Sequence, residues 1–377
     1  MILRRHIQKS IEDSLFKGKI IVIYGARQVG KTILVKEIQK KYPDHSLYLN
    51  CDEPDIKNAL SDKTSTQLKA YFGNNRLVII DEAQRVTNIG ITLKLIFDTF
   101  PEVQVIATGS SSFELANKIV EPLTGRKREF FLTPLTVSEY MSLSSPIEFQ
   151  RMIENRMLFG MYPGVVINDS REERKNIEEI AKSYLYKDIL EFDKIRNPES
   201  VEKLLKALAL QVGNEVSYNE LALTAGINKA TVEKYIQILE QAFIIFRLKP
   251  YYKNARNELT KLRKIYFYDL GIRNAIINNF NHFDERNDVG TLWENFVISE
   301  RMKKNSVEDV TVTPYFWRTI EGREIDYLED MGNTLSAYEI KWSELNSSAV
   351  APKTFSDNYP KTPYKVITPE NFFDFVT

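Results

Sequence analysis

The sequence is poor in cysteine and in long apolar runs. Cys51 is the single cysteine of the chain, which excludes an internal disulfide and a cysteine-based zinc cluster and favours a reducing compartment. The longest apolar runs, such as Ile20–Tyr24 and Leu77–Ile80, have the length of strands and fall far short of the roughly 20 residues that cross a bilayer. The N-terminal segment MILRRHIQKSIEDSLFKGK has the pattern of a charged amphipathic helix rather than an apolar signal core. We therefore expect a cytoplasmic protein with no membrane partner.

The chain also lacks an excess of charge of either sign. Its 51 Lys and Arg balance its 51 Asp and Glu, so the surface as a whole cannot act as a basic coat for nucleic acid. Any such partner must meet a local basic patch. With 43% hydrophobic residues and few glycines or prolines, the composition is that of a globular protein. A length of 377 residues predicts two or three domains.

The hydrophobic pattern changes twice along the chain. Up to about residue 165, short apolar strands (KIIVIYG, HSLYLN, RLVIID and VQVIATG) alternate with helical stretches, which predicts a parallel sheet covered by helices on both faces. The next stretch has mainly helical periodicity, and the last part combines one helix, Leu292–Met302, with strands such as TPYFWR, REIDYLE and LSAYEIKW. We expect an α/β chain of three domains: 1–165, 166–280 and 281–377.

A complete phosphate-loop motif, GARQVGKT, follows the first apolar strand. Its glycines allow backbone amides to surround phosphate oxygens, and the helix that follows presents its positive end to the same anion. Lys31 is expected to reach the β- and γ-phosphates, and the Thr32 hydroxyl to bind Mg²⁺. The predicted nucleotide-binding residues are Gly25, Ala26, Arg27, Gln28, Val29, Gly30, Lys31 and Thr32.

An acidic pair, Asp81-Glu82, ends the apolar run Leu77–Ile80. An aspartate at this strand end is expected to hold Mg²⁺ together with Thr32, and the adjacent glutamate to orient and deprotonate the attacking water. The Asn-Lys-x-Asp motif typical of guanine recognition is missing, because neither Asn117-Lys118 nor Asn228-Lys229 is followed by the aspartate. We therefore expect an ATP hydrolase with ATP and Mg²⁺ as its ligands.

Two further catalytic roles have candidates downstream. A polar residue after the strand Val103–Ala107, either Ser110 or Thr108, is expected to sense the γ-phosphate, although the same stretch also fits a helix N-cap. Phosphoryl transfer usually needs one more positive charge, often from a neighbouring subunit. Arg126 of Leu123-Thr-Gly-Arg126 is the candidate, which implies a homo-oligomer. Because surface arginines are common, an ordinary surface role for Arg126 stays open.

The ordered motifs GARQVGKT, RLVIIDEAQR, ATGSSSFEL, LTGR, TPLTVSEY, GMYPGVV and KIYFYDLGIRNA cover nearly the whole chain. Together they resemble the prokaryotic AAA+-related ATPases fused to a C-terminal domain of unknown function, which are akin to a widespread archaeal ATPase family. The resemblance implies an additional-strand P-loop core, a winged-helix module and a restriction-endonuclease-like C-terminal domain. It also matches Lys31, Thr32, Asp81 and Glu82 to that family's ATPase residues, and the Ser110 stretch to its sensor.

The segment YNELALTAGINKATVEKYIQILEQA predicts two short helices, Tyr218–Ala225 and Lys229–Ala242, joined at Gly226. In such a helix-turn-helix, the outward face of the second helix meets DNA. The strands FIIFRL and KIYFYD then flank a basic loop that resembles a wing, with seven basic residues against one acid between Arg247 and Lys264. The candidate DNA-binding residues are Lys229, Thr231, Lys234, Lys253, Arg256, Lys261 and Arg263. Glu233 on the outward face is unfavourable for DNA, and such modules also serve as protein-contact modules.

The C-terminal part carries a pattern typical of magnesium nucleases. Asp326 lies near the start of a strand, and Glu339 and Lys341 are two residues apart, so they point to one face of the next strand. Two carboxylates can hold Mg²⁺ while the lysine orients the hydrolytic water, and Glu294 can complete the metal shell. Asp326, Glu339 and Lys341 stand at the positions of the D…E-x-K pattern of restriction-endonuclease-like folds, which this part of the chain resembles. Two outcomes stay open: a working nuclease, or a binding scaffold without chemistry.

The leading hypothesis is an ATP hydrolase that couples ATP binding to contact with duplex or branched DNA, with nuclease activity as a further option. The alternative is a nucleotide-switched ATPase whose C-terminal half binds a protein partner. Outside these sites, the run Arg171–Lys175 (REERK) is expected to form a solvated helix face.

Overall fold

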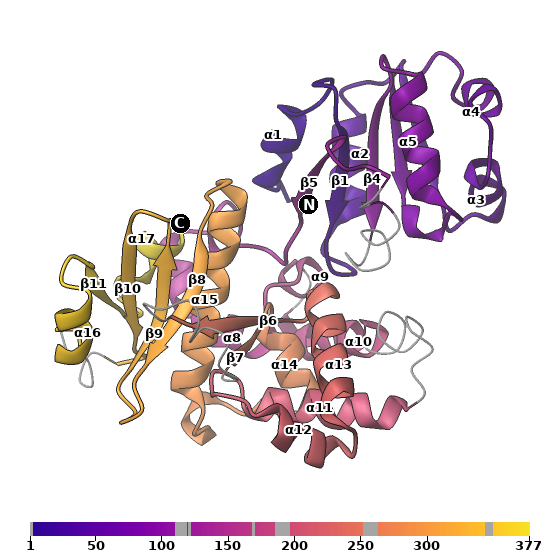
Figure 1. Cartoon of the computed structure of the whole chain (residues 1–377). Coiled ribbons are helices and arrows are strands. Elements are labelled where there is room, and N and C mark those ends of the chain that lie inside the picture. The colour runs from indigo at the N-terminus through magenta and orange to yellow at the C-terminus, as the bar shows by residue number, and fades with distance from the viewer. Residues whose placement is uncertain are drawn as a thin grey trace. The chain divides into compact units, whose positions relative to one another are not determined.

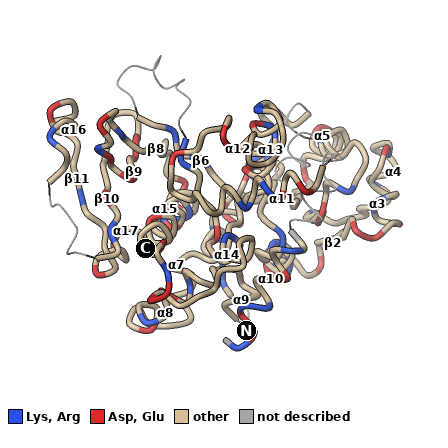
Figure 2. The backbone as a smooth tube through the Cα atoms, turned by 90° about the horizontal axis from the view of Figure 1, so that it is seen from below, with Lys and Arg blue, Asp and Glu red and all other residues tan. Residues whose placement is uncertain are grey.

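The chain was analysed as a computed structural model, which describes residues 3–109, 119, 122–167, 170–184, 197–251, 263–343 and 350–377. These residues form two compact units (Figure 1). The first comprises residues up to Pro134 with two short later segments, and the second comprises the rest. Lys and Arg alternate with Asp and Glu along both units (Figure 2). No helix in these ranges combines the length and the apolar character that a membrane crossing requires.

The first unit is a parallel sheet with its helices. In chain order its elements are α1 (Ile7–Glu12), β1 (Ile20–Tyr24), α2 (Lys31–Gln39), β2 (Ser46–Asn50), α3 (Pro54–Leu60), α4 (Ser65–Phe72), β3 (Leu77–Asp81), the 3-10 helix η1 (Ala83–Arg85), α5 (Ile89–Thr99), β4 (Gln104–Gly109) and β5 (Lys127–Phe131). The strand order is β2-β3-β4-β1-β5, and all neighbours are parallel. Strand β4 therefore lies between β1 and β3, which confirms the additional-strand core that the resemblance implies.

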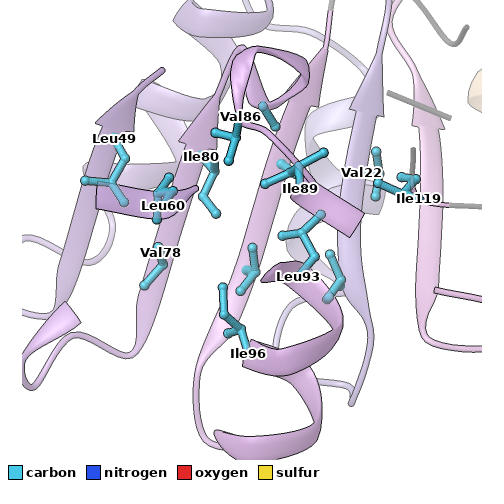
Figure 3. Packing of buried hydrophobic residues seen from close by; sticks show 14 of the residues in the cluster. Val22, Leu49, Leu60, Val78, Ile80, Val86, Ile89, Leu93, Ile96 and Ile119 are labelled. Carbon is cyan, nitrogen blue, oxygen red and sulfur yellow. The ribbon is translucent and has the colours of Figure 1, made fainter. Parts of the chain in front are cut away.

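The three inner strands of this sheet, β3, β4 and β1, are buried on both faces. Every residue of β1, β3 and β4 is buried, as expected when helices cover a parallel sheet on each side. Alternate residues such as Val22, Val78 and Ile80 pack with Leu93 and Ile96 of α5 in one apolar cluster (Figure 3). Helix α2 contacts β3 and β4. This packing fixes the carboxyl ends of β1, β3 and β4, where the predicted nucleotide residues stand.

The second unit begins with helices. They are α7 (Val137–Met141), α8 (Pro146–Phe159), α9 (Pro163–Val166), the 3-10 helix η2 (Ser170–Glu172), α10 (Glu173–Tyr184), α11 (Pro198–Leu210), α12 (Tyr218–Ala225) and α13 (Lys229–Gln241). The prediction that the run Arg171–Lys175 (REERK) forms a solvated helix face is wrong at Glu173. This side chain is 5% exposed and forms an ion pair with Arg156, which is 1% exposed. A buried charge of this kind needs such a partner, and the partner on α8 is not apparent from the local run of charges.

In the described ranges, the rest of the second unit is a mixed sheet with helices and a 3-10 turn. Its elements are β6 (Ile245–Pro250), β7 (Lys264–Phe267), α14 (Leu270–Ile276), η4 (Phe283–Glu285), α15 (Val289–Val307), β8 (Thr313–Arg318), β9 (Glu324–Asp330), β10 (Leu335–Ile340), α16 (Lys353–Asn358), β11 (Tyr364–Ile367) and α17 (Phe372–Val376). The strand order is β11-β10-β9-β8-β6-β7. The hairpin β6–β7 is antiparallel, and β6 joins β8 in a short parallel pairing at Lys249–Tyr315.

One sheet therefore spans the predicted boundary between residues 280 and 281. Helix α15 contacts both β7 and β10, so the same helix covers strands from both sides of that boundary. The division into three domains stays a prediction. The structure itself separates into two compact units.

Candidate functional site

The phosphate loop leads from β1 into α2 with two glycines in demanding positions. A side chain on Gly25 would place its Cβ 2.2 Å from the backbone oxygen of Leu132, so only glycine fits there. Gly30 has φ +99°, a left-handed conformation that side chains strongly disfavour. Gly30 caps the N-terminus of α2, so the free amides of the first helical turn face the loop. This geometry fits a bound phosphate group.

Lys31 and Thr32 begin α2 and point into the loop. The Lys31 ammonium is buried and donates hydrogen bonds of 2.8 Å to the carbonyl oxygens of Gly25 and Ala26. The Thr32 hydroxyl donates a 2.7 Å hydrogen bond to Asp81 Oδ2. The structure therefore brings together the lysine, the hydroxyl and the carboxylate that the sequence predicts for one site.

Asp81 is the centre of this site. Its carboxylate is 2% exposed and accepts hydrogen bonds from Thr32, from the Tyr48 hydroxyl at 2.6 Å, and from the Thr108 hydroxyl. The hydroxyl and carboxylate oxygens of Thr32 and Asp81 are hard ligands of the kind that Mg²⁺ prefers. The residues present therefore fit the predicted magnesium position.

Glu82 follows Asp81 in a left-handed conformation, with φ +54°. Its amide donates to the Thr108 hydroxyl at 3.1 Å, and its Oε2 accepts a 2.5 Å hydrogen bond from Gln84 Nε2. Strained backbone conformations of this kind cluster at functional sites. Thr108, one of the two residues expected to sense the γ-phosphate, thus contacts both acidic residues; Ser110, the other, lies outside the described residues.

Arg126 does not join the phosphate loop of its own chain. It directly precedes β5, whose first residue pairs with Ile20 at the start of β1, whereas the phosphate loop follows the other end of β1. Five residues of strand separate the two ends by about 16 Å. The Arg126 guanidinium donates a 3.0 Å hydrogen bond to Asp98 and remains 35% exposed. Its catalytic role stays a prediction that requires a neighbouring subunit.

Three residues of this site are not among the predicted site residues, although Tyr48 lies in the strand pattern HSLYLN and Gln84 in the motif RLVIIDEAQR. Tyr48 reaches Asp81 from β2, and Gln84 reaches Glu82 from η1. Arg5 is 7% exposed and donates hydrogen bonds of 2.7 Å to the carbonyl oxygens of Val29 and Thr133, so it fixes the phosphate loop to the chain after β5. In the sequence, Arg5 is marked only by its place in the predicted N-terminal helix. That pattern does not indicate which residues Arg5 contacts.

In the second unit, α12 and α13 form the two predicted helices. Gly226 ends α12 in the left-handed conformation with φ +66°, and Val232, Ile236 and Leu239 are buried as expected. Lys229, Lys234 and Gln237 are exposed, whereas Thr231 donates its hydroxyl to Asn228 Oδ1 in the first turn of α13. Thr231 therefore contributes to the start of the helix.

A groove of about 710 Å³ runs along the exposed face of α13. The side chains that line it include Lys229, Lys234, Arg247 and Arg263, with Glu233 as the single acid. Lys229 lies 3.5 Å from Glu233, so part of the basic charge is already balanced. The groove joins the second helix of the pair to the hairpin β6–β7.

The basic excess counted around the hairpin overstates the charge available to DNA. The candidates Lys253, Arg256 and Lys261 lie outside the described residues. Arg247 is held by Glu240 and donates to the Tyr218 hydroxyl at 2.9 Å. Lys264 is 3% exposed and paired inside the sheet. Both residues are therefore committed to internal ion pairs, and a count along the sequence cannot distinguish them from surface lysines and arginines.

The C-terminal candidates come together around the sheet. Lys341 Nζ lies 2.7 Å from Glu339 Oε1 and 3.7 Å from Asp326 Oδ2. Asp326 also accepts a 2.8 Å hydrogen bond from the amide of Ile340. Burial raises the pKa of Glu294 to about 7, with Lys264 opposing the rise and Asp326 adding to it. Burial also raises the pKa of Glu339, and the negative charge of Asp326 adds to this shift.

Two further residues belong to this group. Lys264 Nζ lies 3.1 Å from Glu294 Oε1 and forms an ion pair with Glu324, and Glu324 is two residues before Asp326 on β9. We call Glu294, Glu324, Asp326 and Glu339 the acidic cluster. Within the described ranges, no three His, Cys, Asp or Glu side chains are arranged to hold a metal ion. Lys264 and Lys341 pair with these carboxylates, so the acidic cluster does not present them as free ligands for the predicted magnesium ion.

Three known protein families match successive parts of the chain. Residues 17–141 match an AAA domain, residues 150–282 match a domain of unknown function (DUF8612), and residues 289–372 match another domain of unknown function (DUF4143). The predicted combination of an AAA-related P-loop ATPase domain with a C-terminal domain of unknown function is confirmed. The first unit is thus an ATPase domain of the AAA type.

The relatives are themselves uncharacterized. The protein MJ1544 of Methanocaldococcus jannaschii is 26% identical over 345 residues, covering 85% of this chain and 74% of its own. The protein Rv2008c of Mycobacterium tuberculosis is 24% identical, covering 90% of this chain and 74% of its own. These matches cover most of both chains, in one archaeon and one bacterium.

Solved structures resemble the chain only loosely. The Holliday junction branch migration motor RuvB of Thermotoga maritima overlaps 65% of this chain and 90% of its own, with 16% identity and a TM-score of 0.30. The Pif1 helicase of Candida albicans overlaps 48% of each chain, about half of the helicase, with 15% identity and a TM-score of 0.28. Both TM-scores are low, so neither similarity bears on what this chain binds.

Proposed function

We propose that the chain is a Mg²⁺-dependent ATP hydrolase that couples its nucleotide state to contact with DNA. The observation that supports hydrolysis is the arrangement around Asp81. A phosphate-loop threonine and a strand-end aspartate share a hydrogen bond of 2.7 Å, and Glu82 follows directly. Because a water-activating carboxylate is of no use to a protein that only holds nucleotide, this arrangement favours turnover.

Each residue has a distinct role in this proposal. The amides of Gly25–Thr32 bind the phosphates, and Lys31 exchanges the carbonyl oxygens of Gly25 and Ala26 for phosphate oxygens. Thr32 and Asp81 hold Mg²⁺, which neutralises charge on the phosphates when it is bound. Glu82 accepts a proton from the attacking water, and Thr108 keeps Asp81 and Glu82 in position.

The variant Glu82→Gln tests the division between binding and turnover. We expect it to bind ATP with nearly the affinity of the parent and to hydrolyse it at least about 100-fold more slowly, because general-base catalysis contributes about that much or more. Single-turnover hydrolysis and nucleotide titration measure the two quantities. Glu37→Gln on α2, a half-buried acid that pairs with Lys40, is the matched control. A Glu82→Gln protein with the turnover of the parent would remove Glu82 from the proposed mechanism.

The groove on α13 supports the second half of the proposal. Lys229, Lys234 and Arg263 give it a local positive charge on an otherwise neutral chain, and a helix face beside a hairpin suits the groove of a duplex. Phosphate contacts release counterions, so binding must weaken as salt rises. We expect duplex DNA to bind here, with Lys234→Ala lowering the salt slope by about 1.

A salt series with and without ATP distinguishes this proposal from its rival. The control is Lys203→Ala, an exposed lysine of α11 outside the groove that pairs with Glu199. A slope indistinguishable from zero in the parent would favour a protein partner instead of DNA. That outcome would leave the ATPase proposal intact, because the two sites lie in separate units.

For the acidic cluster, the structure favours the binding scaffold over the nuclease. The carboxylates already have lysine partners, and no group of three among the described residues is arranged for a metal. Incubation with Mg²⁺ or Mn²⁺ and varied DNA structures, comparing the parent with Asp326→Ala and Lys341→Ala, tests this. Cleavage by the parent that both variants lose would restore the nuclease hypothesis.

A further inference from the structure

Lys264 pairs with two members of the acidic cluster, Glu294 and Glu324. It is the first residue of β7, and its side chain is 3% exposed. Its ammonium stands 3.1 Å from Glu294 of α15 and pairs with Glu324 of β9. One lysine thus connects a hairpin strand with the long helix and with a strand of the C-terminal part.

Lys264 serves a group of carboxylates in which Asp326 is buried and Glu294, Glu324 and Glu339 are half-buried. The cluster carries four acidic groups, and Lys341 serves mainly Glu339 and Asp326. Arg318 lies 3.2 Å from Glu324 at the more exposed rim. A buried carboxylate without a positive partner is costly. Lys264 is therefore the cation that serves the Glu294 side of the cluster.

The ammonium of Lys264 places a positive charge next to these carboxylates, because it lies 3.1 Å from Glu294 and pairs with Glu324. A divalent cation entering among the same carboxylates would meet this fixed positive charge at close range and would be repelled.

We infer that Lys264 is the resident cation on the Glu294–Glu324 side of the acidic cluster and keeps a metal ion out of that side, while Lys341 pairs with the predicted magnesium ligands Asp326 and Glu339. The cluster is then an ionic joint between the hairpin β6–β7, α15 and β9. This inference is independent of the proposed ATP hydrolysis. It assigns Lys264 a role inside the sheet rather than on the basic surface of the hairpin.

Removal of the lysine charge tests the inference. Lys264→Met keeps much of the side-chain volume and leaves the four carboxylates with Lys341 and Arg318. We expect this variant to bind one additional Mn²⁺ ion per chain, counted by the loss of the free-Mn²⁺ signal in electron paramagnetic resonance without nucleotide. The nucleotide site is the same in every protein compared, so its contribution cancels. Lys249→Met, an exposed lysine on the adjacent strand β6, is the matched control and should gain no ion.

Two outcomes would overturn the inference. One is a folded Lys264→Met protein that gains no Mn²⁺. The other is a parent protein that already binds a Mn²⁺ ion that Asp326→Asn removes. The second comparison does not depend on how Lys264→Met folds. If Lys264→Met does not fold, the double variant Lys264→Met/Glu324→Gln replaces it, since it removes one positive and one negative charge. The double variant should also bind one additional Mn²⁺ ion.

Discussion

Three hydroxyl groups meet on the carboxylate of Asp81. The Thr32 and Tyr48 hydroxyls donate to one oxygen and the Thr108 hydroxyl to the other. Together they hold the carboxylate in a fixed orientation before any cation arrives. Such preorganisation reduces the reorganisation that substrate binding requires. Of the three donors, Tyr48 is the one that the sequence does not predict as a site residue, although it lies in the predicted strand HSLYLN.

Replacement of Tyr48 by phenylalanine should therefore affect mainly the nucleotide-free protein. We expect the free energy of unfolding to fall by about 1 kcal/mol, the usual value of one hydrogen bond. The loss should be smaller with ADP and Mg²⁺ bound, because the cation then holds the carboxylate. Urea unfolding in both states measures this, with Tyr42→Phe, whose ring packs on Phe16, as control. A loss of equal size in both states would contradict this role.

Glu294 makes the stability of the second unit depend on pH. Burial raises its folded-state pKa from 4.5 to about 7, so folding takes up a proton between these two values. Stability must then fall as pH rises through this window and level off above it. Glu294→Gln removes the titration. The difference in free energy of unfolding between Glu294→Gln and the parent should therefore shift in favour of the variant by about 2 kcal/mol from pH 5 to pH 8.

Chemical unfolding of both proteins at the two pH values measures this gain. Glu285→Gln, an exposed acid of η4, is the control and should change little with pH relative to the parent. A Glu294→Gln protein that loses stability relative to the parent as pH rises would reverse the predicted sign.

The nucleotide residues could be predicted because their chemistry is concentrated in short motifs. Lys31, Thr32, Asp81 and Glu82 each follow from a pattern of a few neighbouring positions. Lys264 could not be predicted in the same way. In the sequence it ends a basic stretch, and its partners Glu294 and Glu324 are 30 and 60 positions away. Its burial depends on sheet pairing that no local pattern encodes.

At the scale of elements, the strands that were predicted are the apolar ones. KIIVIYG, HSLYLN, RLVIID and VQVIATG correspond to β1, β2, β3 and β4, and the three C-terminal patterns to β8, β9 and β10. The sequence did not reveal β5 and β11. β5, at one edge of its sheet, begins with Lys127-Arg128-Glu129, and β11 has four residues at the edge of the other sheet. Edge strands are less buried, so their sequences carry less of the apolar signal.

The turn between α12 and α13 depends on one glycine. Gly226 has φ +66° and open space where a side chain would stand, so Gly226→Ala introduces strain without a clash and should destabilise the protein by about 1 kcal/mol. Gly290→Ala in the first turn of α15 meets equally open space at an ordinary φ and should be neutral or stabilising by about 0.5 kcal/mol. Thermal unfolding compares the two. Equal changes in thermal stability in the two variants would mean that the left-handed conformation of Gly226 does not cause the loss of stability in Gly226→Ala.

At the scale of the whole molecule, the sheet of the second unit crosses a family boundary. Strands β6 and β7 lie in the region matched by one domain of unknown function, and β8–β11 in the region matched by the other. Since β6 pairs with β8 and Lys264 binds Glu324, the two regions share hydrogen bonds and ion pairs. We expect them to unfold together rather than as independent domains.

The position of Arg126 predicts that active sites form between subunits. Arg126 stands at the opposite end of the sheet from its own phosphate loop, so it can act only on a neighbour. Lys31→Ala and Arg126→Ala proteins should each be inactive. A mixture should regain part of the ATP hydrolysis, because an intact site then meets an intact arginine.

Hydrolysis rates of the separate and mixed variants, together with the subunit count in a non-hydrolysable ATP analogue, test this arrangement. A monomer in the presence of the analogue, or an Arg126→Ala protein as active as the parent, would exclude a role in trans.

The central claim is that the phosphate loop and Asp81-Glu82 form a site that hydrolyses ATP. The most direct measurement is phosphate release from ATP and Mg²⁺ by the parent, by Lys31→Ala and by the control Lys40→Ala, an exposed lysine that follows α2. We predict hydrolysis by the parent and by Lys40→Ala, and at least about a 100-fold loss in Lys31→Ala, because electrostatic stabilisation of the transferred phosphoryl group contributes this much. Hydrolysis by Lys31→Ala at the rate of the parent would contradict the claim.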